Sequence, residues 1–351
     1  MERDLFRGSL YTRPMIRCIR WEVPHVATSG GAYARLGAAM ALYLCVAVGD
    51  AQERTMGPLA FITNQDENTV SIISLDKRKV VRTLELGWDP NGVAIDERRR
   101  LVFVTSTKSR EVSSIDPDSL TLLKSVISGY GPIGIVADSR IGRIYVADAH
   151  DKRVRIYDAT SLGFRGEYKT GRGAAGLALA PDGRHLFVAN QDDHNVSVIS
   201  TVDGLTLARI DVGDAPFGVT VSADGQHAFT ANEGSEDVSV IDIATLQSNF
   251  QIAVGKKPFA IAHDPVRQRL FVTNRGEKSV SVVDLKDRRE LTRITVGNNP
   301  QGISIRIHAR EVYVAIASSG SVSIIDADSL KLIGEIATGA GSRAFGSFTL
   351  E

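Results

Sequence analysis

The chain has 351 residues, of which 43% are hydrophobic and 23% are charged, and its 41 basic residues are matched by 41 acidic ones. This composition is ordinary for a soluble globular protein. The balanced charge argues against a general electrostatic grip on nucleic acid, so we expect no nucleic-acid partner.

The first 51 residues have the layout of a secretory leader. Residues 36–48 form the uncharged apolar run LGAAMALYLCVAV, which follows Arg35 and precedes the small-x-small site Gly49-Asp50-Ala51. A membrane span needs about 20 apolar residues, so this run is too short and no transmembrane span is expected. We predict that residues 1–51 are a leader with a signal peptide, and that the mature protein is periplasmic or secreted.

The leader also contains both cysteines, Cys18 and Cys45. Cleavage after Ala51 leaves a mature chain without thiols, which fits an exported protein that is stabilised by its core. A lipid anchor on Cys45 is the alternative, although Leu44 is bulky for such a signal. The arginine-rich stretch before Arg35 is unusual in a signal peptide and indicates that translation starts downstream of Met1.

After the leader, the sequence repeats with a period of 42 residues. A Gly-x-x-Pro-like turn recurs at Gly87, Gly129, Gly171, Gly213, Gly255, Gly297 and Gly339. A strand led by an aromatic residue begins at Phe61, Phe103, Tyr145, Phe187, Phe229, Phe271 and Tyr313. A fixed period of this length indicates stacked supersecondary units.

One unit, residues 171–212, reads as four short strands at 176–180, 185–189, 196–199 and 206–212, separated by turns. Four antiparallel strands make one blade of a propeller. The last segment, residues 342–350, matches the inner-strand sequence that residues 52–58 lack, so we expect it to complete the blade that begins at Phe61. The prediction for residues 52–351 is an all-β, seven-bladed β-propeller with four antiparallel strands per blade.

The segments Phe271-Val-Thr-Asn274, Phe61-Ile-Thr-Asn64 and Val238-Ser-Val-Ile-Asp242 resemble the YVTN-repeat β-propeller family. The resemblance covers residues 59–351. It implies a relationship to exported bacterial proteins, archaeal surface-layer proteins and propellers linked to haem d1 or quinones. The motif is specific for the fold, and it does not select a function among these.

Residues that recur in every blade are interpreted as structural. The column Asp116, Asp158, Asp242, Asp284 and Asp326 ends the third strand, where carboxylates shape turns by accepting backbone hydrogen bonds. The column that contains Asn64 and Asn190 is interpreted as a second set of turn residues. Function is therefore expected where the blades differ.

The loops that enter the inner strands differ most. One end of the ring is expected to carry aromatic and cationic side chains, namely Trp88, Tyr130, Arg172, Phe217, Lys256, Lys257, Phe259 and Arg343. We call these eight residues the predicted rim. Such a rim suits an anionic or aromatic ligand, or a segment of a protein partner. The competing interpretation is a set of solvated loop residues and packing aromatics.

Three histidines are the weaker candidates for catalysis. His150 and His194 lie in equivalent loops of consecutive blades, and His263 interrupts an inner-strand position that is apolar elsewhere. A core histidine with satisfied hydrogen bonds is the competing interpretation for His263. No loop has the spacing of a calcium motif, and no cofactor motif is present, so neither a metal nor a cofactor is expected.

These observations favour an exported binding or scaffold protein of the cell envelope, which presents one loop face to an unknown small molecule or envelope protein. We expect a monomer. Two alternatives remain open: a small-loop enzyme of the lyase or lactonase type that uses His150, His194 and Arg172, and an accessory protein for a haem d1 or quinone-linked redox system. Whether the protein is an enzyme stays undecided from the sequence.

Overall fold

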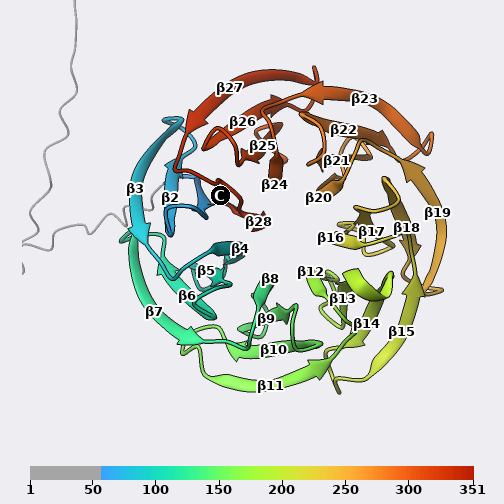
Figure 1. Ribbon diagram of the computed structural model, residues 1–351, viewed down its shortest axis with the longest axis horizontal. Helices are drawn as coiled ribbons and strands as arrows, with labels where there is room; N and C mark the ends of the chain where they lie inside the picture. Colours follow the sequence, from blue (N-terminus) through green and yellow to red (C-terminus); the bar gives the residue numbers. More distant parts are fainter. Residues whose placement is uncertain (1–56) are drawn as a thin grey trace, which may run out of the picture. The chain divides into compact units, whose positions relative to one another are not determined.

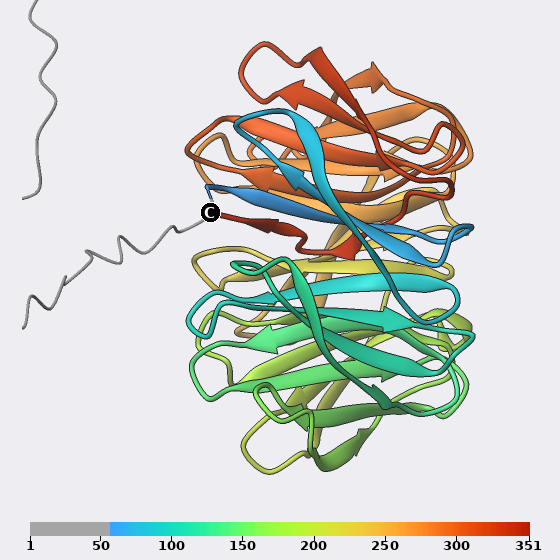
Figure 2. The same cartoon turned by 90° about the vertical axis from the view of Figure 1, so that its left-hand side faces the viewer.

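The computed structural model describes residues 57–351, which form a ring of seven antiparallel sheets around a central channel (Figure 1). The leader predicted for residues 1–51 lies outside the described residues. The predicted fold class is confirmed: each blade has four antiparallel strands, and one of the seven sheets also includes a fifth, short strand that pairs parallel. Figure 2 shows the blades from the side, with their strands crossing the thickness of the ring.

The strands take the same places in every blade. Inner strands are β4 (Pro90–Asp96), β8 (Pro132–Asp138), β12 (Ala174–Leu179), β16 (Pro216–Val221), β20 (Pro258–Asp264) and β24 (Pro300–Arg306). Second strands are β1 (Leu59–Asn64), β5 (Leu101–Ser106), β9 (Arg143–Asp148), β13 (His185–Asn190), β17 (His227–Asn232), β21 (Arg269–Asn274) and β25 (Glu311–Ile316).

Third strands are β2 (Thr69–Ser74), β6 (Glu111–Asp116), β10 (Arg153–Asp158), β14 (Asn195–Ser200), β18 (Asp237–Asp242), β22 (Ser279–Asp284) and β26 (Ser321–Asp326). Outer strands are β3 (Lys79–Glu85), β7 (Thr121–Ile127), β11 (Phe164–Lys169), β15 (Thr206–Asp211), β19 (Gln247–Ala253), β23 (Arg289–Thr295) and β27 (Lys331–Ala337). One short 3-10 turn, η1 (Gln191–Asp193), lies between β13 and β14.

The C-terminal segment closes the ring in two steps. Its strand β29 (Thr349–Leu350) pairs antiparallel with β1 and completes the first blade, as the sequence predicts. Before that, β28 (Phe345–Gly346) leaves this blade and pairs parallel with β4 of the next one. The segment therefore bulges toward the channel axis, where Figure 1 shows β28.

The core lies between adjacent blades. The second strands begin two residues before the predicted start, so the repeated aromatic residue is their third residue, and it is almost completely buried in all seven blades. Apolar clusters join neighbouring sheets; one of them contains Phe229 and Val240 of one blade together with Leu270 and Val272 of the next. Closing the ring therefore buries both faces of each small sheet, which a single blade cannot do alone.

The inner strands approach each other closely because glycine occupies their third position in most blades. A Cβ atom on Gly134 would lie 2.1 Å from the carbonyl oxygen of Ala175 in the next blade. Real Cβ atoms do not come this close, so the narrow ring of inner strands depends on these glycines.

The aspartates that recur at the ends of the third strands shape the turns that follow, as predicted. Asp158 accepts hydrogen bonds from the backbone nitrogens of Thr160 and Ser161 at 3.1 and 2.9 Å. These bonds, led by the one from Ser161, and the Arg165 guanidinium hold the pKa of Asp158 well below its usual range. The low pKa therefore reflects turn formation.

Candidate functional site

One end of the ring, which we call the mouth, is formed by two sets of loops that bond to one another. The loops that enter the inner strands lie against the loops between second and third strands: Thr107 N donates to Asp89 O at 2.9 Å, and Gln191 N donates to Gly173 O at 3.0 Å. Both loop sets therefore lie at the same end of the ring.

The Asn column holds these two loop sets together and does more than shape a turn. Asn190 is fully buried; its Oδ1 accepts from Gly171 N at 2.9 Å, and its Nδ2 donates to Ser197 Oγ at 2.8 Å. Asn64 bonds Gly339 N and Ser71 in the same way. The mouth loops are therefore fixed to the rigid sheets, which preorganises any side chain they carry.

Four members of the predicted rim lie on the exposed outer part of the mouth. Trp88 is 68% exposed and lines a shallow hollow with Gln65, Asn68 and Lys108. Lys256 and Lys257 are also exposed, and within residues 57–351 neither forms an ion pair. The fourth, Arg172, places its Nε atom 2.6 Å from Asp193 Oδ1, so its charge is already partnered.

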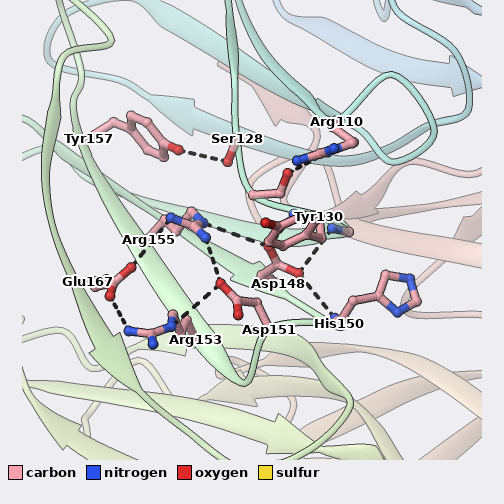
Figure 3. Close-up of polar contacts among 12 residues, drawn as sticks. Arg110, Ser128, Tyr130, Asp148, His150, Asp151, Arg153, Arg155, Tyr157 and Glu167 are labelled. Carbon is pink, nitrogen blue, oxygen red and sulfur yellow. Dashed lines mark hydrogen bonds and ion pairs between the residues drawn. The ribbon is translucent and has the colours of Figure 1, made fainter.

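Tyr130 is exposed as well, but one face of its ring is covered. The Arg110 guanidinium carbon lies 4.4 Å from the centre of the Tyr130 ring (Figure 3). Below it, Asp148 accepts hydrogen bonds from the backbone nitrogens of Tyr130 and Gly131 at 2.7 and 3.0 Å. Asp148 also faces Arg155 at the start of an ion-pair network, so these charges order the loop.

The other three rim residues, Phe217, Phe259 and Arg343, lie at the channel axis. The Phe217 and Phe259 rings are stacked with centres 4.2 Å apart. Phe345 of the bulging C-terminal segment meets Phe217 edge-on at 5.1 Å and Phe259 at 5.5 Å. We call these three rings the aromatic plug, because they come from three different blades and fill the axis just below the mouth.

Arg343 sits among polar groups that are incompletely satisfied. Its side chain donates a hydrogen bond to Asn91 Oδ1, while its Nε atom is buried without a partner within residues 57–351. Gln301, on the neighbouring inner strand β24, is only 2% exposed. Its Oε1 atom also has no hydrogen-bond partner within residues 57–351. Burial lowers the pKa of Arg343, Asp89 opposes this shift, and Arg275 adds to it.

Arg275 supplies the second guanidinium of this region. Its guanidinium carbon lies 4.5 Å from the centre of the Phe259 ring, and its Nη2 donates to Glu233 Oε1 at 2.7 Å. The part of the mouth near the channel axis thus contains two arginines, Arg343 and Arg275, and Arg275 is paired with a carboxylate. We call Asn91, Gln301, Arg343 and Arg275 the axial polar cluster.

His150 and His194 lie against different loops of the mouth. The His150 ring packs against Gly131 of its own blade and, in Figure 3, lies away from the Asp148 carboxylate. His194 Nδ1 accepts from Ala215 N of the next blade at 3.0 Å. Within residues 57–351, no group of three or more His, Cys, Asp or Glu side chains is arranged to hold a metal ion.

His263 lies at the other end of the channel. It lines a cavity of about 460 Å³ that runs below the aromatic plug along the inner strands. The axial polar cluster does not contribute to the lining of this cavity. His263 is half-buried, and burial lowers the pKa of its imidazole, which Asp224 and Asp264 oppose.

Sequence reasoning did not select Asn91, Gln301, Arg275 or Phe345 as site residues. Asn91 and Gln301 occupy the same position of the repeat as Phe217, Phe259 and Arg343. This shared position is the sequence signal that could have identified them. Arg275 lies in the second loop set, and only the folded ring shows that its side chain reaches Phe259. The place of Phe345 depends on the bulge of β28, for which the repeat has no equivalent.

Comparison with known proteins supports the fold. The family described as YNCE-like β-propeller matches residues 144–266, whereas no curated protein matches the sequence. Within residues 57–351, the structure contains no helix long and apolar enough to cross a membrane.

Three solved structures are similar in fold. A functionally unknown protein from Desulfotomaculum acetoxidans has a TM-score of 0.71 at 15% identity, covering 82% of this chain and 99% of its own. Hydrazine synthase from Kuenenia stuttgartiensis has a TM-score of 0.64 at 18% identity, covering 72% and 87%. The dihydro-haem d1 dehydrogenase NirN has a TM-score of 0.63 at 13% identity, covering 83% and 74%.

Proposed function

We propose that this chain is an exported ligand-binding propeller of the cell envelope, which holds a small organic acid at the mouth of its channel. The observation that carries the proposal is the buried, unpartnered pair of Arg343 Nε and Gln301 Oε1 beside the axis. Unsatisfied buried polar groups are rare in folded proteins. The two segments are neighbours, since Gly302 N donates to Arg343 O at 2.8 Å, so a donor and an acceptor left without partners here favour a polar ligand.

The charge of the region selects the kind of ligand. Arg275 is neutralised by Glu233, whereas the Arg343 side chain has, among residues 57–351, only the neutral Asn91 as a hydrogen-bond partner. A carboxylate can accept from the Arg343 guanidinium, and a neighbouring hydroxyl can donate to Gln301 Oε1. A hydroxy acid therefore satisfies both groups at once. A carboxylate-bearing segment of a protein partner is the alternative occupant.

The test measures the melting temperature of the wild-type chain with a set of small hydroxy acids, including 2-hydroxybenzoate, and with the uncharged 2-hydroxybenzyl alcohol as the matched compound. Acids should raise the melting temperature, and the alcohol should not. In Arg343→Met the dissociation constant should rise about 10-fold or more, because a hydrogen bond to a charged group is worth about 1.5–3 kcal/mol.

Arg172→Met is the control variant, because Arg172 is exposed at the rim and already paired with Asp193. It should bind the acids as the wild type does. If every acid stabilises Arg343→Met as strongly as the wild type, or if no acid stabilises the wild type, the axial polar cluster is not the binding site.

We propose no second function. The enzyme hypothesis requires His150 and His194 to act together, and within residues 57–351 they contact different loops. The similarity to hydrazine synthase and NirN favours the redox-accessory hypothesis. At sequence identities of 18% and 13%, however, this similarity supports only a shared fold.

A further inference from the structure

The cavity below the aromatic plug, which we call the chamber, is separate from the mouth. Its lining begins at Phe345 and extends along six inner strands to Ala223, Pro265 and Ile307, in the turns that follow these strands. Those turns lie at the end of the ring opposite to the mouth. The chamber therefore opens on the other face and is independent of the proposed acid site.

Among residues 57–351, no Asp, Glu, Lys or Arg side chain lines the chamber. Inner-strand residues such as Ile95, Leu179, Val221 and Ile305 form most of its wall, and His263 is its one titratable group. Moving a charged ligand into such surroundings would cost several kcal/mol without a compensating partner. The chamber thus discriminates against ions.

His263 replaces the aliphatic residue that the other inner strands of the lining have at this position, and the hydroxyl residues Thr220, Ser304 and Ser347 also line the chamber. Its ring stacks on Phe229 with centres 5.6 Å apart, which fixes the plane of the imidazole. Within residues 57–351, its side chain forms no hydrogen bond, and its ring nitrogens are not among the fully buried atoms, so they are accessible to a ligand in the chamber. A neutral imidazole offers one donor and one acceptor.

We propose that the chamber is a second binding site, for an uncharged and mainly apolar small molecule with one polar group that bonds to His263. The volume of about 460 Å³ lies within the range of ligand pockets. Mostly apolar side chains with a small number of polar groups are the usual composition of such pockets. The apolar body of the ligand contacts the aliphatic wall, and its polar group supplies the partner that His263 lacks.

The experiment compares two fluorescent probes that share one apolar body. N-phenyl-1-naphthylamine is neutral and has a single N–H donor, whereas 8-anilinonaphthalene-1-sulfonate adds a permanent negative charge. Titration of the purified chain should give saturable binding of the neutral probe, with the anionic probe at least about 10-fold weaker because the chamber cannot solvate its charge.

Two variants locate the site. Ala137→Trp fills the chamber at a position where other blades have Leu179 or Ile305, and it should abolish binding of the neutral probe. His263→Leu keeps an apolar side chain at this position and should weaken the neutral probe about 3–10-fold, the loss of one hydrogen bond. Arg172→Met, on the exposed rim of the mouth, should leave probe binding unchanged.

Each variant is first checked by its melting temperature and its near-ultraviolet circular dichroism, so that probe binding to a loosened core is recognised. The proposal is overturned if the neutral probe does not bind, if both probes bind equally well, or if a folded Ala137→Trp binds like the wild type. Because Arg343 is not involved, these results leave the acid site at the mouth untouched.

Discussion

At the scale of single residues, one threonine hydroxyl can join two blades. Thr105 Oγ1 accepts from Gly92 N of its own sheet at 2.9 Å and donates to Ile133 O of the next blade at 2.7 Å. Thr63 and Thr273 form equivalent bridges. The threonine at this position thus fixes blade to blade, and the asparagine that follows it in Thr63-Asn64 and Thr273-Asn274 bonds to the next strand of its own blade.

We expect Thr105→Val to lower the free energy of unfolding by about 1–3 kcal/mol, because it leaves a buried N–H and a buried carbonyl without their partner. Denaturant unfolding measures the change. Thr206→Val, on an exposed outer strand, is the matched control and should change stability by less than about 0.5 kcal/mol. Equal effects of the two variants would contradict the bridging role.

The free energy of unfolding should depend on pH through His263, and the direction of this dependence follows from the pKa of the imidazole. Its pKa in the folded state is below the unfolded value of about 6.5, because burial disfavours the charged ring. Between these two pKa values the unfolded chain binds more protons, so the folded chain loses stability as the pH falls through about 6.5, and the loss levels off below the folded pKa. Asp224, Asp264 and His227 face the ring and set the size of the shift.

The measurement is the free energy of unfolding of the wild type and of His263→Leu at a series of pH values. The wild type should lose more stability on acidification than the variant does. Parallel curves for the two proteins would show that the imidazole is not desolvated in the folded state.

The rim residues show how far sequence reasoning extends at this scale. Phe217 and Phe259 stood out because most blades have other residues in their column, yet their stacking with Phe345 depends on the path of the closing segment. Unpartnered atoms such as Arg343 Nε could not be predicted, since they depend on what the surrounding loops leave free.

At the scale of elements, the closing segment is the exception to the repeat. Its sequence fits the register of an inner strand, and the ring closure that follows from this register is confirmed. The structure differs in that residues 345–346 turn inward and pair with β4. Gly346 permits this path: its φ is +112°, and a Cβ atom there would lie 2.4 Å from Val93 O.

Gly346→Ala should therefore destabilise the ring by about 1–3 kcal/mol or more, through backbone strain and the contact with Val93 O. Gly334→Ala is the control, because a Cβ atom there meets only Ile324 and Arg78 side-chain atoms at 3.5 Å or beyond. Calorimetric melting of the two variants gives the comparison. A tolerated Gly346→Ala would mean that the inward path is not required for closure.

At the scale of the whole molecule, the channel is divided into two parts of opposite character. The axial polar cluster faces the mouth, the aromatic plug fills the axis below it, and the uncharged chamber opens on the other face. The period of 42 residues predicted the number and form of the blades, because every blade obeys the same packing rules. The division of the channel comes from one irregular segment, which a periodic pattern cannot contain.

Export is a further prediction for the whole chain. If residues 1–51 are a cleaved leader, the mature protein begins at Gln52, and its intact mass, measured on material from a periplasmic or secreted fraction, should agree with this start. A protein that begins at Cys45 and carries acyl chains would establish the lipid-anchor alternative. A chain that keeps residues 1–51 and stays with the cytoplasmic fraction would contradict export.

The most direct measurement of the central claim, that the mouth holds a small acid, is a crystal structure of the chain with the hydroxy acid that stabilises it most. We expect density for the acid at the axis, with a carboxylate oxygen within hydrogen-bond distance of Arg343 Nε and a hydroxyl facing Gln301 Oε1. An acid bound elsewhere on the ring, with the axial polar cluster left free, would contradict the proposed function.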